Sequence, residues 1–576
     1  MKSWTPASRN LRNVRVTIFF SLLLIVSFLA LGARCFYLQS VRAEHYLDAS
    51  LKQQRAFRSR QPQRGVILDC RGRVLAASNG IQTIFADPRE IKDAKETSTE
   101  LASIVDMGAH IICKLILESN NPRFVRIKNT TDANECSASR GIHGIGVYSG
   151  WQRHYPMGHL VSNVIGFASV DNRGLEGIEL KYDEELSGSA ARSTFLADVR
   201  RRPIRPKHQD GILTNGVGII LTIDSTIQQF VRDELIKQCE NYEAESAVAI
   251  VAEPRSGAIL AMVSLPDFDP ANVGTTDPNN FRSRAITDWY EPGSILKPII
   301  AAIALDAGVV NTTEKIFCEN GSYSGKHNGK SFGRIGEYKD GFGDLTVREI
   351  LIKSSNIGMA KIGQRLGKER LHDGLKLFGF GEKTGIELPG EVRGQLHPPQ
   401  DWTGYSVTRI PFGQEICVTA MQLIRAFSML ANGGRLVSPF LVRAIVNSDG
   451  KVTELKRPAP PVGYLVKPEV AKWVVGEAMA SVVNEGTGKR AQLDDWQVFG
   501  KTGTANIANS DSRGYSNRDY VASFIAGAPA EDPAIVVLVS VRKPNLSLKK
   551  GYTGGVVSSP VAREIIERTL RYLGVE

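Results

Sequence analysis

An uncharged apolar run near the N-terminus constrains this chain first, because it decides on which side of a membrane the remainder can fold. The run covers residues 16–33 and extends to about residue 38 if Arg34 reaches the membrane interface. This length is just sufficient for one helix to cross a bilayer. The sequence therefore predicts a transmembrane anchor over residues 16–38.

The charges beside the anchor predict its orientation. Positive side chains precede it at Lys2, Arg9, Arg12 and Arg15. Because cations favour the cytoplasmic side, we expect a cytoplasmic tail over residues 1–15 and an extracytoplasmic, periplasmic location beyond residue 39, at the cell (inner) membrane. The alternative is a signal peptide with residues 30–32 as its cleavage site, although the apolar run exceeds the usual length for such a peptide.

A candidate nucleophile lies at Ser294, which is followed by Lys297 and Pro298. Pro298 has no N–H and its ring clashes with the carbonyl four residues earlier, so a helix through residues 299–305 can barely extend N-terminal of Ser294. Lys297 then projects from the same helix face, which puts its amine within reach of the Ser294 hydroxyl. The helix N-terminus adds positive potential to both groups. A serine activated by a lysine is a workable nucleophile.

Two further motifs give this pair a context. Ser-x-x-Lys alone proves little, since residues 547–550 also match it and a capped helix with a solvated lysine is the plainer interpretation there. The further motifs are Ser354-Ser355-Asn356 and Lys501-Thr502-Gly503-Thr504. After Ser294, they follow the order found in active-site-serine penicillin-binding proteins and serine β-lactamases, which they resemble.

Both later motifs have a second copy elsewhere in the chain. A Ser-x-Asn at residues 119–121 lies upstream of Ser294, and a Lys-Thr-Gly at residues 383–385 follows Ser354 too closely, in a glycine-rich turn region. Lys501 is better placed, because residues 520–527 alternate like a strand that could pair beside it. We therefore assign the site to the copies at Ser354 and Lys501.

The N-terminal half carries a closer family resemblance. Residues 64–76 resemble the first conserved motif in the pedestal of class B, monofunctional penicillin-binding proteins. Residues 153–158 and 174–179 resemble the second and third motifs of that pedestal. Residues 413–423 and 552–555 are similar to further landmarks of the family, so the resemblance covers nearly the whole chain. It implies structural rather than catalytic roles for Arg64, Asp69, Arg153 and Glu176.

The expected fold class is α/β (α+β), a penicillin-binding transpeptidase or serine β-lactamase-like fold behind a mostly extended pedestal. Residues 246–263 alternate like a hairpin, residues 534–540 are typical of a buried strand and residues 561–570 of an amphipathic helix. A helical subdomain is expected between residues 300 and 490. A strand leading into a helix near residue 225 sets the boundary. We expect a pedestal, or dimerisation, domain over residues 39–225 and a transpeptidase domain over residues 226–576.

Acyl transfer assigns roles to five side chains. Ser294 must lose a proton, and Lys297 can accept it only when neutral. The reference pKa of lysine is about 10.4, and burial together with the charge of Lys501 would lower it. We therefore predict Lys297 as the general base. Ser354 would pass the proton between the lysines toward the leaving D-alanine amine, and Asn356 would bind the substrate's peptide backbone.

The third motif is expected to bind substrate. The resemblance implies that the backbone N–H groups of Ser294 and Thr504 stabilise the oxyanion, and that Thr502, Thr504 and Lys501 bind the terminal carboxylate of a D-Ala-D-Ala stem peptide. Gly503 has a physical explanation, since a side chain there would obstruct close approach of the substrate strand. A β-lactam presents the same carboxylate and carbonyl, so inhibition by β-lactams is expected.

Other classes of site are not indicated. Seven cysteines show no paired spacing, so we expect scattered buried thiols and leave any disulfides open. Nine histidines show no metal-ligand spacing, so we predict no metal site and no cofactor. The net charge of +11 could suggest nucleic acid, but no recognition motif appears, and anionic lipid or cell-wall polymer fits better.

The resemblance favours a division-type peptidoglycan D,D-transpeptidase and implies an FtsW-type membrane glycosyltransferase and other division proteins as partners. An elongation-type transpeptidase, a D,D-carboxypeptidase, a penicillin sensor and a non-catalytic division scaffold stay open as alternatives. The sequence offers no carboxylate placed to activate a deacylating water, which favours transpeptidation over hydrolysis. No Glu-Asp-x-x-Phe signature lies between the anchor and residue 225, which argues against a bifunctional enzyme with a glycosyltransferase domain.

Overall fold

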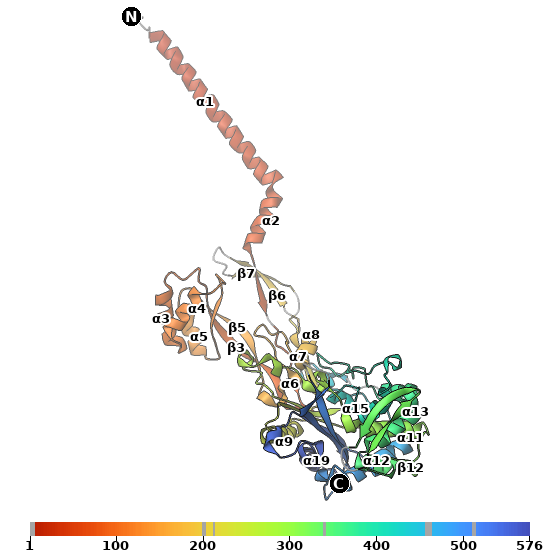
Figure 1. The fold of residues 1–576 in the computed structure, drawn as a ribbon. Helices are drawn as coiled ribbons and strands as arrows, with labels where there is room; N and C mark the ends of the chain where they lie inside the picture. The colour runs from red at the N-terminus through yellow and green to blue at the C-terminus, as the bar shows by residue number, and fades with distance from the viewer. Residues whose placement is uncertain are drawn as a thin grey trace. The chain divides into compact units, whose positions relative to one another are not determined.

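The computed structural model describes residues 6–60, 62–189, 191–197, 203–210, 213–337, 341–447, 449–455, 463–509 and 514–576 (Figure 1). The chain forms two compact units. The first contains residues 1–62 and 189–214, and the second contains residues 63–188 and 215–576.

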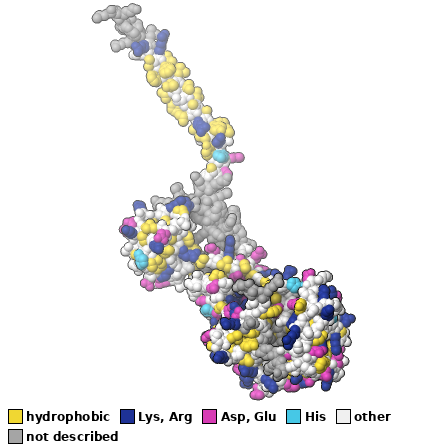
Figure 2. Space-filling view, viewed as in Figure 1, with side chains coloured by type: hydrophobic (Ala, Val, Ile, Leu, Met, Phe, Trp, Pro, Cys, Tyr) yellow, Lys and Arg dark blue, Asp and Glu magenta, His cyan; other side chains and the backbone are white. Residues whose placement is uncertain are grey.

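The first unit carries the apolar helix. Helix α1 (Pro6–Phe36) continues through a π-helical turn (Tyr37–Val41) and is followed by α2 (Ala43–Gln54). The segment Arg12–Val41 is long and apolar enough to cross a membrane, and its most apolar part has a mean hydropathy of 2.5. Figure 2 shows hydrophobic side chains along this helix, and none of that part is buried against protein. An apolar surface of this kind is stable only in an apolar environment, and the membrane predicted around this anchor would supply one.

The same unit contains a three-stranded antiparallel sheet in the order β1-β6-β7. Its strands are β1 (Arg55–Arg60), β6 (Ala191–Ala197) and β7 (Pro203–Asp210).

One sheet of the second unit joins segments far apart in the sequence. Its order is β18-β17-β8-β2-β3-β4, with β5 beside β3. The strands are β2 (Ile67–Leu68), β3 (Val74–Ala86), β4 (Val125–Thr130), β5 (Ile145–His154), β8 (Gly218–Leu221), β17 (Val442–Val446) and β18 (Val452–Leu455). Strand β8 pairs in parallel with β2 and antiparallel with β17, so the sheet crosses the expected boundary at residue 225.

Short helices complete the pedestal region. They are α3 (Ala94–Val105), α4 (Ala109–Leu117), α5 (Ala133–Ser139), α6 (Ser162–Ile165), α7 (Gly177–Lys181) and α8 (Asp183–Ser187). A small core that includes Ile84, Leu101, Ile112 and Ile127 packs α3 and α4 against β3 and β4. The region expected to be mostly extended therefore combines its long strands with helices.

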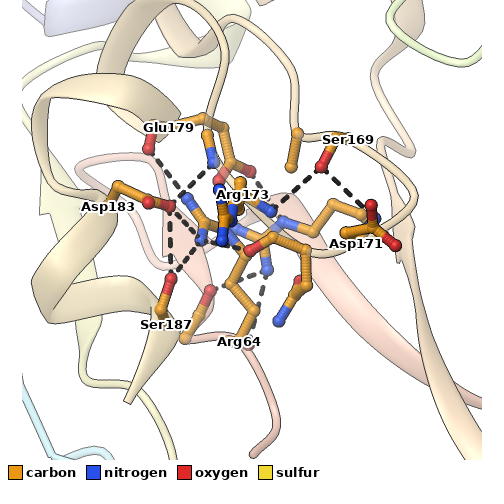
Figure 3. A network of polar contacts seen from close by, with 12 residues as sticks. Arg64, Ser169, Asp171, Arg173, Glu179, Asp183 and Ser187 are labelled. Carbon is orange, nitrogen blue, oxygen red and sulfur yellow. Dashed lines mark hydrogen bonds and ion pairs between the residues drawn. The ribbon is translucent and has the colours of Figure 1, made fainter. Parts of the chain in front are cut away.

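Buried charges hold the pedestal motifs together (Figure 3). The Arg64 guanidinium is fully buried and donates from Nε to Glu179 Oε2 (2.5 Å) and from Nη1 to Asp183 Oδ1 (2.6 Å). Arg153 Nε donates to the other oxygen of Glu179 at 2.7 Å. Buried ions are tolerated when paired in this way. The structural carboxylate of the third motif is thus Glu179, and Glu176 contributes no side-chain hydrogen bond to this network.

Asp69 ties the pedestal to the next segment of the chain. Its carboxylate accepts from the backbone N–H groups of Arg71 and Arg73 (2.9 and 2.8 Å) and from the hydroxyl of Ser225 (2.7 Å). Ser225 is the first residue of α9 (Ser225–Tyr242). The buried Asp69 therefore fixes the start of the helix at which the expected domain boundary lies.

A five-stranded antiparallel sheet forms the centre of the C-terminal part, in the order β10-β9-β21-β20-β19. Its strands are β9 (Ser246–Ala252), β10 (Ile259–Leu265), β19 (Phe499–Ala508), β20 (Tyr515–Ala528) and β21 (Ile535–Arg542). The predicted hairpin is β9 with β10, and the predicted buried strand is β21. The strand predicted beside Lys501 is β20, which pairs with β19.

Both faces of this sheet are covered. Along β9, Ala247, Ala249 and Val251 pack in one core with side chains of α9 and α19 (Ser559–Leu573), and the alternate residues pack in the core on the opposite face. Helices α9 and α19 contact each other and lie together in Figure 1. Because successive side chains point to opposite faces, burial on both sides explains why these strands are apolar runs. Helix α19 is the predicted closing helix.

A largely helical region lies between residues 284 and 484, as predicted for residues 300–490. Its helices are α10 (Arg284–Thr287), α11 (Lys297–Asp306), α12 (Val347–Lys353), α13 (Asn356–Leu377), α14 (Ser406–Arg409), α15 (Ala420–Ala431), α16 (Pro468–Trp473) and α17 (Ala480–Asn484). The short helix α18 (Gly554–Val557) follows the last strand of the central sheet. Two-stranded sheets accompany them, formed by β11 (Trp289–Tyr290) with β16 (Val418–Thr419), β12 (Lys315–Phe317) with β15 (Asp344–Thr346), and β13 (Ser322–His327) with β14 (Lys330–Gly336).

The cysteines are unpaired. All seven are free, and the expectation of buried thiols holds for Cys136 and Cys318. Cys35 is exposed on α1, and the other four are half-buried.

Candidate active site

Ser294 lies in a short 3-10 turn, Gly293–Leu296, directly before α11. The α-helix begins at Lys297, three residues after Ser294, which the position of Pro298 had placed in the first turn of the helix. The turn is fixed at Gly293, whose backbone N–H donates to the Gly413 carbonyl at 3.1 Å and whose φ is +55°. The half-buried Ser294 side chain lines a groove on the surface of the molecule.

The Lys297 side chain is fully buried and directed at the second motif. Its Nζ donates to the backbone carbonyl of Ser354 (2.6 Å), to Ser354 Oγ (3.2 Å) and to Asn356 Oδ1 (2.8 Å). The Ser294 hydroxyl, which the helix geometry put within reach, is not among its hydrogen-bond partners in the described residues. The amine is therefore held at the base of the groove by the Ser354-Ser355-Asn356 loop.

Lys501 approaches the same loop from the sheet. It is fully buried on β19, the edge strand, and its Nζ donates to Ser354 Oγ at 3.0 Å and to the Thr502 carbonyl at 3.2 Å. The Ser354 hydroxyl thus lies between the two amines. Ser354 itself has a left-handed backbone (φ +57°), a strained conformation for a residue other than glycine that often marks functional loops.

Burial changes the proton affinity of both lysines. It lowers the pKa of Lys501 from its ordinary 10.5 to about 7. The pKa of Lys297 is lowered well below its ordinary value by burial and, in addition, by the charge of Lys501. A low-dielectric site disfavours an ammonium, and two ammonium groups near each other disfavour it further. The site therefore supplies a neutral amine at a pH where an exposed lysine would be charged.

The other residues of the third motif line or support the groove. Thr502 and Thr504 line it, and the Thr502 hydroxyl is 2.6 Å from the hydroxyl of Thr487. A Cβ added at Gly503 would meet Ile295 Cγ1 at 2.8 Å and the Pro292 carbonyl oxygen at 3.1 Å. Glycine is therefore required there for packing against the turn that carries Ser294, which is a different obstruction from the one predicted with the substrate strand.

The groove has a volume of about 1130 Å³ and brings the three motifs together. Ser294, Ser354, Asn356, Thr502 and Thr504 all line it. Its wall carries both basic and acidic side chains, and Arg348 and Glu485 of this wall form an ion pair. An extended peptide can lie along such a groove beside the free edge of β19.

The second copies of the motifs lie elsewhere. Thr384 of the second Lys-Thr-Gly donates from its backbone N–H and its hydroxyl to Glu391, both at 2.6 Å. Ser119 makes a local turn with Asn121, and Ser547 lies in a 3-10 turn. None of these residues lines the groove. The choice of motif copies made from spacing agrees with this arrangement.

Sequence reasoning missed several residues that build the site. Glu337 accepts hydrogen bonds from the Ser354-Ser355-Asn356 loop, and Thr487 contacts Thr502. Gly413, noted only as part of a family landmark, lies so close to Gly293 that an added Cβ would be 2.1 Å from the Gly293 carbonyl oxygen. Glu337 and Thr487 belong to no motif that we recognised, and their partners are distant in the sequence.

The described residues contain no group of three or more His, Cys, Asp or Glu side chains that could hold a metal ion.

Two protein families match this chain. Residues 247–567 match the family described as penicillin binding protein transpeptidase domain, and residues 59–216 match the penicillin-binding protein dimerisation domain.

Similar proteins match along most of their length. Stage V sporulation protein D of Bacillus subtilis is 34% identical, over 98% of this chain and 87% of that protein. Peptidoglycan D,D-transpeptidase FtsI of Escherichia coli is 30% identical, over 89% of this chain and 84% of that protein. The crystal structure of penicillin binding protein 3 from Mycobacterium tuberculosis, complexed with aztreonam, has a TM-score of 0.68 at 24% identity, over 90% of this chain and 98% of that one. At 24% identity, this last comparison shows a likeness of fold alone.

Proposed function

The chain belongs to the class B penicillin-binding proteins and is a peptidoglycan D,D-transpeptidase, and we propose that it cross-links stem peptides through an acyl-enzyme on Ser294. The observation that carries this assignment is the Ser354 hydroxyl between two fully buried lysines, at the base of the groove that Ser294 lines. Acyl transfer requires a neutral amine that can accept the proton of the nucleophile, and the two buried lysines supply amines of this kind beside Ser354, the proposed proton relay.

Acylation begins when Ser294 Oγ attacks the carbonyl between the two terminal D-alanines. Neutral Lys297 accepts the Ser294 proton as general base, and the burial of its amine supports that role. The proton passes through Ser354, whose hydroxyl contacts both lysines, to the leaving amine. The C–N bond breaks, terminal D-alanine departs and an ester forms on Ser294. Asn356, held by Lys297, binds the peptide backbone of the substrate.

The developing oxyanion requires preorganised donors. We assign this role to the backbone N–H groups of Ser294 and Thr504. A Cβ added at Gly293 would lie 3.3 Å from the Thr504 carbonyl oxygen, so the two segments lie side by side, which supports the assignment. Thr502, Thr504 and Lys501 bind the terminal carboxylate, and Gly503 lets their strand pack against the Ser294 turn.

The second half-reaction transfers the acyl group to an amine of a neighbouring stem peptide. That amine attacks the ester carbonyl, its proton returns to Ser294 through the same lysines, and a new amide forms. β-Lactams carry an equivalent carbonyl and carboxylate, so they acylate Ser294 and block the site. A carboxypeptidase would instead transfer the acyl group to water.

We place the reaction outside the cell membrane, in the periplasm. The apolar helix Arg12–Val41 supports an inner-membrane anchor over residues 16–38, with residues 1–15 as a cytoplasmic tail. Residues 39–225 then form the pedestal, or dimerisation, domain and residues 226–576 the transpeptidase domain. Septal wall synthesis is the proposed role, with an FtsW-type membrane glycosyltransferase and other division proteins as partners of the anchor and pedestal. An elongation role is the alternative.

Labelling of the detergent-solubilised chain with fluorescent penicillin tests the acyl-enzyme. Peptide mapping should locate the adduct on Ser294, and Ser294→Ala should remove it without loss of folding. An adduct at another residue, or none on folded protein, would overturn the assignment and favour a non-catalytic scaffold.

Paired donor and acceptor peptidoglycan strands test the acceptor. Cross-linked product supports transpeptidation, whereas hydrolysed product alone would identify a carboxypeptidase. Replacing residues 16–38 by an unrelated transmembrane helix should leave penicillin binding intact and abolish co-purification with the FtsW-type protein.

A further inference from the structure

Glu337 lies outside every motif, directly after β14, and its carboxylate contacts the loop that contains Ser354. Its Oε1 accepts from the Ser355 hydroxyl (2.5 Å) and from the Ile357 backbone N–H (3.2 Å). Its Oε2 accepts from the Asn356 backbone N–H (2.8 Å). The carbonyl of the preceding residue, Gly336, accepts from Asn356 Nδ2 at 3.1 Å. Both the backbone and the side chain of the loop are thus held by one short segment.

The loop needs an external restraint. Ser354 ends α12 in a left-handed conformation, and Ser355 is the N-cap residue of α13. The first backbone N–H groups of a helix have no partner within the helix, and a carboxylate is a favourable acceptor for them because the helix dipole is positive there. Glu337 supplies that acceptor. Without it, the strained conformation of Ser354 would lose the contacts that compensate for it.

Holding this loop determines where its catalytic atoms lie. Asn356 Oδ1 accepts from Lys297 Nζ at 2.8 Å, and Ser354 accepts from the same amine through its carbonyl and its hydroxyl. The Asn356 amide can present Oδ1 to Lys297 because its Nδ2 is bound by Gly336. A displacement of the segment at Glu337 would therefore move every hydrogen-bond acceptor of Lys297.

Glu337 also carries a negative charge that acts on Lys297. The charged groups that act on Lys297 are Lys501, from β19, and Glu337, from the end of β14; the contacts from α12 and α13 are made by the neutral Ser354 and Asn356. A carboxylate near an amine stabilises the ammonium form, opposing the effect of burial and of the second lysine.

We propose that Glu337 is a positioning residue for acylation, which holds the Ser354-Ser355-Asn356 loop against Lys297 and stabilises the protonated form of Lys297 through its charge. The role rests on the proposed function of Ser294 and Lys297, and it assigns the segment after β14 to the active site. Glu337 acts through the loop and does not touch the reacting atoms.

The two parts of this role affect different measurements. Loss of the restraint slows acylation at every pH. Loss of the negative charge makes protonated Lys297 less stable, so that the neutral base persists to lower pH. The rate of acylation falls on acidification as Lys297 becomes protonated, and this acid limb of the pH profile moves to lower pH when the charge of Glu337 is removed.

The experiment compares rate constants of acylation by fluorescent penicillin between pH 5.5 and 9.5, using the detergent-solubilised full chain. Glu337→Gln loses one carboxylate oxygen and the charge. We expect its plateau rate to fall about 10- to 100-fold because the loop is displaced, and its acid limb to move down by about one pH unit. Glu337→Asp keeps the charge and shortens the side chain, so its plateau should fall while its acid limb stays in place.

Glu391 provides a matched control. Its carboxylate accepts from a hydroxyl and from the backbone N–H groups of Thr384 and Gly385, so it restrains a turn in the same manner outside the groove. Glu391→Gln should lower thermal stability without changing either the plateau or the acid limb.

The outcomes separate this role from the proposed function. If Glu337→Gln keeps the wild-type plateau and acid limb, or if it changes only stability as Glu391→Gln does, Glu337 is not a positioning residue. An acid limb that moves equally in Glu337→Asp would also overturn the role assigned to its charge. If wild-type protein forms no adduct that Ser294→Ala removes, the proposed function fails and the role of Glu337 fails with it.

Discussion

Replacing Lys501 by methionine should make the protein more stable while it abolishes acylation. Methionine has a similar length and no charge, so it can fill the same buried space. The folded protein disfavours the ammonium at this position, as the fall of the Lys501 pKa from 10.5 to about 7 indicates. This difference in pKa means that burying Lys501 lowers the free energy of unfolding by about 4 kcal/mol at pH 7.

Two favourable interactions are lost in exchange. Lys501 Nζ donates to Ser354 Oγ and to the Thr502 carbonyl, and each such hydrogen bond contributes about 1 kcal/mol to stability. The expected net gain for Lys501→Met is therefore about 2 kcal/mol at pH 7. Ser354 Oγ keeps its contact with Lys297, so it is not left without a partner.

The pH dependence has a defined sign. The pKa of Lys501 is lower in the folded than in the unfolded chain, so between about pH 7 and pH 10.5 the unfolded state binds more protons. Stability then rises with pH through this window and is lowest below pH 7. Lys501→Met should flatten that rise, by at most about 1.4 kcal/mol per pH unit.

Denaturant unfolding of the detergent-solubilised wild type and variant at pH 7, 8 and 9 measures both quantities. We expect the stability difference to be largest at pH 7 and to shrink toward pH 9. A variant that is less stable than wild type at pH 7, or a stability difference that does not depend on pH, would refute the reasoning that burial of the Lys501 ammonium destabilises the folded protein.

Three further predictions concern packing, ion pairs and substrate recognition. Gly413→Ala should slow acylation by fluorescent penicillin about 100-fold, because its Cβ collides with the turn before Ser294, whereas Gly433→Ala, also at positive φ but with open space around the Cβ, should leave the rate unchanged. Arg64→Met should lower the free energy of unfolding by about 3–5 kcal/mol in denaturant titrations, because the buried Glu179 and the half-buried Asp183 lose a partner; a loss below about 1 kcal/mol would contradict this. Thr487→Val should slow acylation by a penicillin with a free carboxylate about tenfold but not by its methyl ester, since it removes the partner of the Thr502 hydroxyl; equal slowing of both would argue against a role in carboxylate binding.

The local chemistry of the site could be predicted because it depends on short sequence distances. Pro298 limits the helix, so Ser294 and Lys297 had to lie near its N-terminus, and Ser294 lies in the turn directly before α11 while Lys297 is the first residue of α11. The copies of the other motifs were chosen because a strand pattern followed Lys501, and that strand, β20, pairs with the strand that carries Lys501.

Contacts between distant segments could not be predicted in this way. Lys297 is directed at Ser354 and Asn356, and nothing in the spacing of Ser294 and Lys297 indicates that direction. Glu337 reaches the loop only because the hairpin of β13 and β14 ends beside α13, which depends on tertiary packing. The role of Gly503 was assigned to the substrate for the same reason, since its neighbour Ile295 comes from another part of the chain.

The pedestal shows the same limit on a larger scale. The motifs there predict structural residues, and Arg64, Asp69 and Arg153 are buried or nearly so, with several partners each. Within the third motif, helix α7 points Glu179 rather than Glu176 at Arg64, a pairing that the motif alone does not indicate. A one-turn difference along a short helix decides which of two glutamates pairs.

The shared sheet of β2, β8 and β17 has a consequence for how such genes can be recombined. A crossover near residue 225 would join the N-terminal half of one relative to the C-terminal half of another, and the new protein would have to form β8 against a foreign β17. The side chains where β8 meets β17 must fit each other in the hybrid, and Asp69 must still bind the start of α9. A hybrid of the two halves should therefore fold only when its parents match at these contacts, although the halves are matched as two families.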